Sequence, residues 1–225
     1  FGAIERLLAA SDEEARFSLL ASLVIRGMGS RSATLGRWLI ARGLAAPDHR
    51  LSDSVIRLIA DANVEGWRPL ATTLLKSGKD RNFTAAQVLA EHEPTEDEWR
   101  SFIGVLDAAP TTSDASWVLV ALAAFAEAPS LPAVVRREAL DRALPLARAS
   151  EFYGTGTMDV VEALKTFPVE QRIEGLKSLR GGASSVMGRV ALRELVVADR
   201  VNAIEHAKEL ARSETGDAAE ALGIT

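Results

Sequence analysis

The segment PTEDEWRSFIGVLDAAP, residues 94–110, decides the fold class because it holds a complete helix with its start and stop signals. Thr95 is followed three positions later by Glu98, which is the capping-box pattern of a helix N-terminus. From Trp99 onward, apolar residues recur at i, i+3, i+4 and i+7, so they share one helix face. The pattern predicts an amphipathic helix that ends near Ala108.

Similar helix starts recur along the chain. Every second expected start falls at Ser11, Ser52, Thr95, Pro132 and Pro168, at intervals of 41, 43, 37 and 36 residues. Short connections predict antiparallel neighbouring helices. Hairpins that recur about every 36–47 residues have the period of HEAT and armadillo arrays. We therefore expect an all-α chain, with one α-solenoid domain of about five stacked antiparallel hairpins over residues 1–225.

Composition favours the same class. Only 5% of the residues are aromatic, and the helix formers Ala, Leu, Arg and Glu are abundant. The absence of Cys excludes a disulfide scaffold. The formal charge of −5, from 26 basic and 31 acidic side chains, disfavours binding to nucleic acid.

Several shorter helices are expected between these landmarks. One covers about Val64–Lys76, and the next is capped by Thr84 and reaches Glu91. The apolar segment 117–125 should be buried on nearly every side. Gly154-Thr-Gly156 is expected to break the chain before a helix that starts at Met158.

The helix pairs resemble HEAT-type α-solenoid repeats over most of the chain, although no repeat reproduces a family consensus residue by residue. The resemblance implies a non-catalytic interaction or scaffolding module that presents a curved surface to another protein or peptide. A globular bundle of irregular helices is the alternative fold. Phe1 at the start indicates a piece of a longer protein, and we expect a bacterial, cytoplasmic one without a membrane span. Its partner's identity and its oligomeric state stay open.

Two other function classes are considered. HEAT-like alkylpurine DNA glycosylases resemble this chain in length and helical build, and they place an Asp among aromatic residues. Asp114 and Trp117 are close in sequence, but the negative charge and the expected burial of Trp117 disfavour that activity. The third hypothesis is a sensor or regulatory segment of a larger nucleotide-driven switch protein.

The sequence predicts no catalytic, cofactor or metal site. HEAT-like deoxyhypusine hydroxylases hold iron with several His-Glu pairs, whereas this chain matches only one, at His92 and Glu93. His49 and His206 converge on nothing. The segment Gly154-Thr-Gly-Thr157 lacks the residues of a nucleotide-binding loop, so an inter-repeat turn is favoured over a phosphate site.

The best basic concentration lies near the C-terminal end, between Arg172 and Arg200. We predict that Arg180, Arg189 and Arg193 contribute to partner binding, because Arg189 and Arg193 are i, i+4 neighbours on one helix. Acidic residues interleave with them, so solvated ion pairs are the alternative explanation for these side chains.

Overall fold

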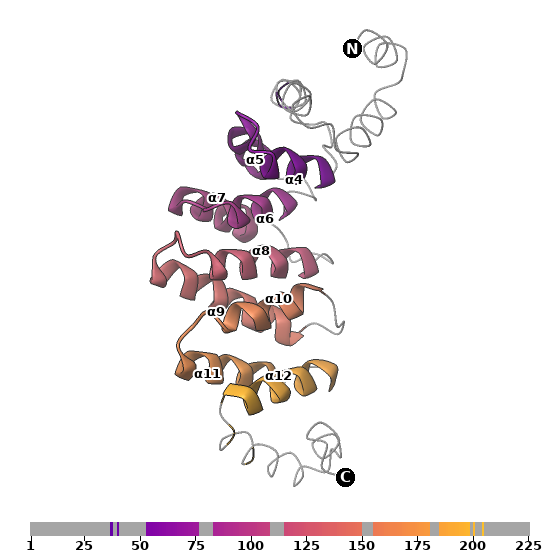
Figure 1. Ribbon diagram of the computed structural model, residues 1–225, viewed down its shortest axis with the longest axis vertical. Helices are drawn as coiled ribbons and strands as arrows, with labels where there is room; N and C mark the ends of the chain where they lie inside the picture. Colours follow the sequence, from indigo (N-terminus) through magenta and orange to yellow (C-terminus); the bar gives the residue numbers. More distant parts are fainter. Residues whose placement is uncertain are drawn as a thin grey trace. The chain divides into compact units, whose positions relative to one another are not determined.

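The computed structural model describes residues 53–76, 83–108, 115–149, 155–180 and 185–198, together with Arg37, Ile40, Arg200 and Ile204. This part of the chain is helical and contains no strand, which confirms the expected all-α class for it (Figure 1). The helices are α4 (Asp53–Asp61), α5 (Trp67–Lys76), α6 (Phe83–Glu91), α7 (Glu96–Ala108), α8 (Ala115–Glu127), α9 (Ala133–Ala149), α10 (Thr155–Leu164), α11 (Val169–Arg180) and α12 (Ser185–Ala198).

The chain divides into two compact units. Unit 1 comprises Phe1–His92 and Asp97–Ala109, and unit 2 comprises Glu93–Glu96 and Pro110–Thr225. The expectation of one domain over residues 1–225 stays a prediction.

Unit 1 has a small apolar core between α4, α5 and α6, each of which packs on the other two. Leu70 and Leu75 of α5 and Leu89 of α6 are fully buried, and Phe102 of α7 is also inaccessible to solvent. Burying each such side chain contributes about 1.5–3 kcal/mol before the entropy cost of folding is subtracted.

Helix α7 begins at Glu96, one residue after Thr95, as the capping pattern predicts. Trp99 and Phe102 are buried, while Ile103 and Leu106 are half-buried. The apolar stripe is therefore confirmed, with its first half carrying most of the burial.

The C-terminus of α4 closes in a Schellman motif. The amide of Val64 donates to the carbonyl of Ile59 at 3.1 Å, and the amide of Asn63 donates to the carbonyl of Ala60 at 2.8 Å. Asn63 has φ 47°, in the left-handed region that this motif requires. The motif satisfies two carbonyls that would otherwise lack an intrahelical donor.

The expectation that α5 begins at Val64 is wrong by three residues. Val64 is occupied in the Schellman motif, and Gly66 takes φ 89°, so helical geometry starts only at Trp67. Pro69 is then the third helical residue, where the absence of its N–H costs no intrahelical bond.

Thr84 is not the capping residue of α6, contrary to expectation. The helix is already formed at Phe83, and Thr84 is buried within its first turn. The reason is that Thr84 precedes the buried Ala85 and Ala86, so this turn faces the core rather than solvent.

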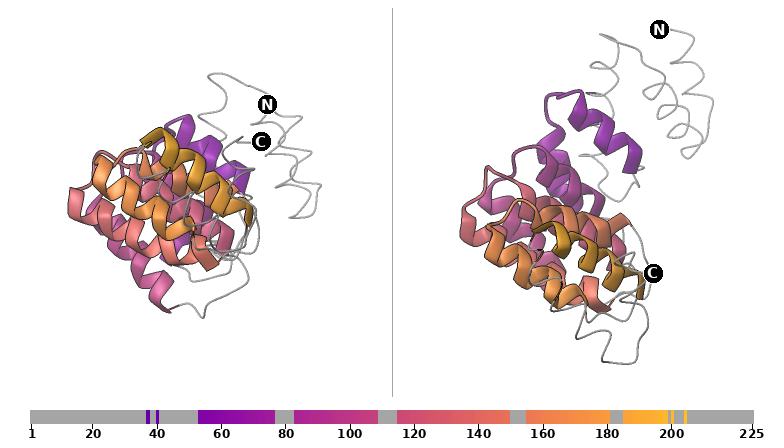
Figure 2. Two further views of the ribbon diagram at one scale, coloured as in Figure 1. Left: turned by 90° about the horizontal axis from the view of Figure 1, so that it is seen from below. Right: turned by 60° about the horizontal axis from the view of Figure 1, so that its bottom comes forward.

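In the described part of unit 2, each helix packs on the next one, and α8 and α9 also pack on the helix after that. α8 contacts α9 and α10, α9 contacts α10 and α11, and α11 contacts α10 and α12. Figure 2 shows these helices lying side by side. Leu122 and Phe125 of α8, Leu140 of α9 and Leu164 of α10 form the centre of the core.

Helix α11 approaches α10 very closely at Gly175. A Cβ atom at this position would lie 2.4 Å from Cδ2 of Leu164, which is itself fully buried. The contact between the two helices therefore depends on the missing side chain of Gly175.

The glycine-containing segment before α10 is partly helical, contrary to the expected turn. α10 begins at Thr155 rather than Met158, and Gly156 and Thr157 are buried in its first turn. Burial of this turn is incompatible with an open phosphate-binding loop at these residues. Gly154 lies outside the described residues.

The start of α9 follows the prediction. The carbonyl of Pro132 accepts from the amides of Val135 at 3.0 Å and Arg136 at 3.1 Å, so Pro132 stands at the helix entrance. Pro145 does not end the helix, which continues to Ala149.

None of the described helices is long and apolar enough to cross a membrane.

Candidate protein-binding surface

Helix α12 has one buried face and one exposed face. Leu192 and Leu195 are buried, and the neighbouring helix is α11. Arg189 and Arg193 point the other way and are exposed, as is Val197, whose side chain is 73% accessible. These exposed residues recur every four positions, which places them on one side of the helix.

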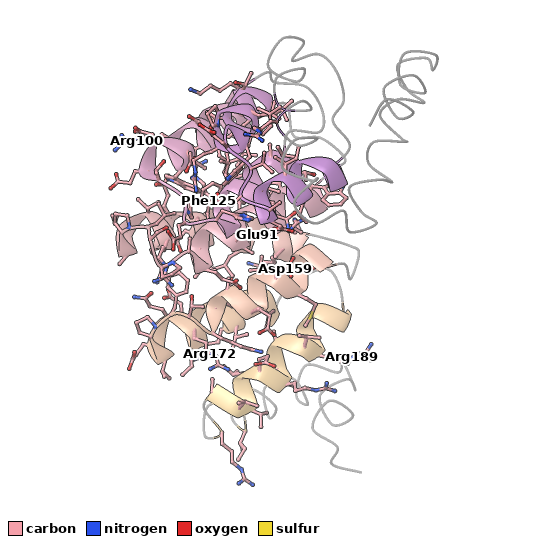
Figure 3. The ribbon with its side chains drawn as sticks, turned by 45° about the horizontal axis from the view of Figure 1, so that its top comes forward. Glu91, Arg100, Phe125, Asp159, Arg172 and Arg189 are labelled. Atoms are coloured by element: carbon pink, nitrogen blue, oxygen red, sulfur yellow. The ribbon has the colours of Figure 1, made fainter. Side chains whose placement is uncertain are left out.

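We call Arg189, Val190, Arg193 and Val197 the outer face of α12. Val190 is half-buried, and it lies seven residues before Val197 in the same register. Figure 3 labels Arg189 at the edge of the helices of this unit. The outer face thus combines two cationic and two apolar side chains.

Among the residues that the structure describes, neither Arg189 nor Arg193 has an ion-pair partner. Glu194 follows Arg193 in sequence but faces the preceding helices instead. Its Oε2 lies 3.4 Å from Nη2 of Arg172 and 3.6 Å from Nζ of Lys165. Glu194, the acidic residue nearest in sequence to Arg193, therefore pairs with Arg172 and Lys165.

The cations of α9, in contrast, are paired within unit 2. Nε of Arg137 lies 2.9 Å from Oδ1 of Asp141, and Nη2 of the same residue lies 3.6 Å from Oε2 of Glu174 on α11. Arg142 pairs with Glu138 at 3.4 Å. Unpaired arginines are thus not a general property of this surface.

The other members of the predicted basic concentration differ in their surroundings. Arg172 is half-buried, with 18% of its side chain accessible, and its Nε has no hydrogen-bond partner in the structure (Figure 3). Lys177 and Arg200 are exposed. Arg180 ends α11, and its side chain lies outside the described part of the chain.

Lys165 lies in the turn between α10 and α11, beside two carboxylates. A hydrogen bond from its Nζ to Glu162, 2.6 Å long, raises the pKa of Lys165 above its ordinary value of 10.5, with Glu194 contributing in the same direction. The ammonium group thereby holds Glu194 toward the turn, away from the outer face of α12.

A second polar cluster lies in unit 1, around Arg68. Nη1 of Arg68 donates to both carboxylate oxygens of Glu98 at 2.8 Å, and Nη2 donates to the carbonyl of His92. The guanidinium carbon also lies 4.8 Å from the ring centroid of Trp67. Arg68 therefore joins α5 to the end of α6 and the first turn of α7, which is a structural role.

His92 is fully engaged within this cluster. Nδ1 lies 2.9 Å from the carbonyl of Val88, and Nε2 lies 3.3 Å from Oδ1 of Asp61. Its ring packs against Trp67, with the centroids 5.1 Å apart. Both ring nitrogens are occupied by protein oxygens, so His92 cannot ligate a metal in this arrangement. The described residues contain no group of three or more His, Asp or Glu side chains that could hold a metal ion.

Four residues of the sequence-based hypotheses have no described position. His49, Asp114, Gly154 and His206 lie outside the described residues.

Trp117 is exposed, contrary to the expectation that its helix is buried on nearly every side. Trp117 is 48% accessible, whereas Ala121, one turn further along the same side of α8, is fully buried. The exposure on this side is therefore confined to the first turn of the helix.

Neither a known protein family, nor a curated protein, nor a solved structure matches this chain.

Proposed function

We propose that this chain is a HEAT-like helical-repeat protein whose role is to bind another protein and hold it on a helical surface, without catalysis. The observation that carries the proposal is the outer face of α12, where exposed cationic and apolar side chains stand together and no described acidic residue pairs with the two arginines. Helical-repeat proteins bind partners through extended exposed surfaces of this kind.

An internal sequence repeat supports the repeat architecture. Residues 132–140 read PAVVRREAL and residues 168–176 read PVEQRIEGL, so Pro, Arg, Glu and Leu recur with a constant offset of 36 residues. The two segments open α9 and α11, which pack on each other. The two segments align with Pro132 opposite Pro168.

The repeated arginines both form hydrogen bonds within unit 2. Arg136 donates from Nη2 to Oγ1 of Thr166 at 2.9 Å, and Arg172 donates from Nη2 to Oε2 of Glu194 at 3.4 Å. Thr166 lies in the turn between α10 and α11, whereas Glu194 lies on α12, the helix that follows α11. The two arginines therefore hold equivalent sequence positions but use different acceptors.

The packing of unit 2 fits the same architecture. Helix α8 contacts α10, and α9 contacts α11, so helices two positions apart in the chain pack on each other. In a stack of hairpins, such contacts form the two layers of helices. We extend this arrangement to a solenoid of about five hairpins as part of the proposal.

The test is the isolation of a protein complex. The full chain, immobilised through a terminal tag, is incubated with extract of the organism that encodes it, and a retained protein is then purified and mixed with the chain. We expect the two to co-elute at fixed stoichiometry in size-exclusion chromatography. If no protein co-elutes, the proposed function is wrong. A mobility shift of duplex or single-stranded DNA at low salt would favour the nucleic-acid alternative instead.

A further inference from the structure

We infer that the outer face of α12 binds an acidic amphipathic helix of the partner, with carboxylates against Arg189 and Arg193 and apolar side chains against Val190 and Val197. This inference rests on the proposed function and names the chemistry of the partner at that surface.

The spacing of the outer face fits a helix laid along α12. Arg189 and Arg193 are separated by four residues, or about 6 Å of helix, and the two valines by seven residues, or about 10.5 Å. A helix with apolar residues one heptad apart and acidic residues beside them has the same spacing. The match requires no rearrangement of α12.

Among the described residues of unit 2, the carboxylates near α12 pair with cations other than Arg189 and Arg193. Glu194 is held by Lys165 and Arg172, and Glu174 by Arg137, so these carboxylates are committed to other cations. Because like charges four residues apart repel, an acidic partner relieves repulsion between Arg189 and Arg193 as well as forming ion pairs.

The apolar part of the face favours a protein over a nucleic acid. Val197 is 73% accessible, and a phosphate backbone offers it no apolar contact. The formal charge of −5 for the whole chain also opposes association with nucleic acid, while a local cationic pair can still attract a carboxylate.

The experiment measures binding of fluorescent peptides to the full chain by anisotropy. The probe is a synthetic peptide of three heptads with leucine at the first and fourth positions of each heptad and glutamate at the flanking positions. One comparison peptide carries lysine in place of glutamate, and a second carries serine in place of leucine. A short fluorescent single-stranded oligonucleotide is the nucleic-acid probe.

Variants of the chain locate the binding. The pair Arg189→Glu and Arg193→Glu reverses both charges, and Val197→Asp removes the apolar contact. The matched control, Lys76→Glu with Arg100→Glu, changes the net charge equally at exposed positions of α5 and α7. Circular dichroism establishes that all variants keep the helical content and thermal midpoint of the parent.

We expect the glutamate peptide to bind the parent and the matched control equally. Loss of two exposed ion pairs accounts for about a two- to thirtyfold change in affinity, and charge reversal adds repulsion of similar size. Binding should therefore weaken at least about tenfold in the Arg189→Glu, Arg193→Glu variant. It should also weaken in Val197→Asp, and both comparison peptides should bind more weakly than the glutamate peptide.

Three results would overturn the inference: no binding of the glutamate peptide, equal binding to the double variant and the matched control, or tighter binding of the lysine peptide. Oligonucleotide binding that depends on Arg189 and Arg193 would assign the face to nucleic acid instead. If the double variant still forms the complex with the purified partner, the proposed function stands and this inference alone fails.

Discussion

Replacing Gly175 by alanine tests the close packing of α10 against α11. The substitution adds a methyl group that would lie 2.4 Å from Cδ2, 3.2 Å from Cδ1 and 3.4 Å from Cγ of Leu164. Leu164 is fully buried, so its side chain has little room to turn aside. We expect Gly175→Ala to force the two helices apart or to displace Leu164 from its rotamer.

The magnitude follows from two opposing contributions. Alanine stabilises a helix interior by about 0.5–1 kcal/mol relative to glycine. Overpacking of a well-filled core costs about 1–3 kcal/mol. The net change for Gly175→Ala is therefore a loss of about 0–2 kcal/mol in the free energy of unfolding.

Gly104 provides the matched control. It lies in the interior of α7, is exposed, and has no atom within 4 Å of the position that a Cβ would occupy. Gly104→Ala should therefore gain the full helix-propensity term of about 0.5–1 kcal/mol. The two substitutions should differ by about 1–3 kcal/mol, which is the overpacking cost alone.

The assay is urea unfolding followed by circular dichroism, with free energies obtained by linear extrapolation. A third variant, Leu164→Ala, and its combination with Gly175→Ala complete a double-mutant cycle. In the cycle, Gly175→Ala should be less destabilising when Leu164 is already truncated, with a coupling of about 1–3 kcal/mol. If Gly175→Ala stabilises the chain as much as Gly104→Ala does, the close approach of α10 and α11 is refuted.

Three further predictions concern turns and ion pairs. Asn63→Gly should raise the free energy of unfolding by a few tenths to about 1 kcal/mol, because φ 47° strains a residue with a Cβ, and Asn63→Val should lower it. Equal thermal midpoints for both variants would contradict the Schellman motif. Arg68→Met should cost about 1–3 kcal/mol, because the buried carboxylate of Glu98 loses its guanidinium, and adding Glu98→Gln should recover part of that loss in urea unfolding. Additive effects of the two substitutions would contradict the direct pairing. The raised pKa of Lys165 implies a stabilisation that is fully present below pH 10.5 and is lost as the pH rises through the higher pKa of the folded state. A carbon NMR titration of the lysine side chain should show that Glu162→Gln lowers this pKa, and an unchanged midpoint would exclude the Glu162 hydrogen bond as its main cause.

Helix starts that depend on local chemistry were predictable from the sequence. Thr95, Pro132 and Pro168 each stand immediately before the helix they were expected to open. In each case the decisive interactions are formed within a few residues, by a capping side chain or by a proline that fits the helix entrance. Such signals do not depend on the rest of the fold.

Two of the wrong predictions concern tertiary packing, whereas the wrong start of α5 results from the local Schellman motif at the end of α4. Thr84 has the chemistry of a cap, but it is buried within α6 because its turn faces the core. Trp117 belongs to an apolar helix, yet it is exposed in the first turn of α8, whereas Ala121 on the same side is buried one turn later. In both cases the residue type permits two environments, and only the arrangement of neighbouring helices selects one.

The placement of Arg189 and Arg193 on one helix was predictable, whereas their role in partner binding stays a prediction. The sequence placed Arg189 and Arg193 on one side of a helix, but it equally allowed ion pairs with Glu194. That choice depends on Lys165 and Arg172, which approach Glu194 from another part of the chain. The sequence separation of Arg193 and Glu194 therefore does not show which cation the Glu194 carboxylate pairs with.

Because Lys165 and Arg172 pair with Glu194, this carboxylate is not paired with Arg193, which motivates the proposed acidic partner. Arg136 reaches Thr166 in the turn before α11, and Arg172 reaches Glu194 on α12, so both arginines use acceptors within unit 2. Arg189 and Arg193 lie on the far side of α12 from these contacts, where no described residue supplies an acceptor. A helix that brings carboxylates to this face would make the kind of contact that already joins successive helices of the unit. The proposed recognition of an acidic partner thus rests on how the described part of unit 2 distributes its carboxylates, with Glu194 and Glu174 paired to other cations.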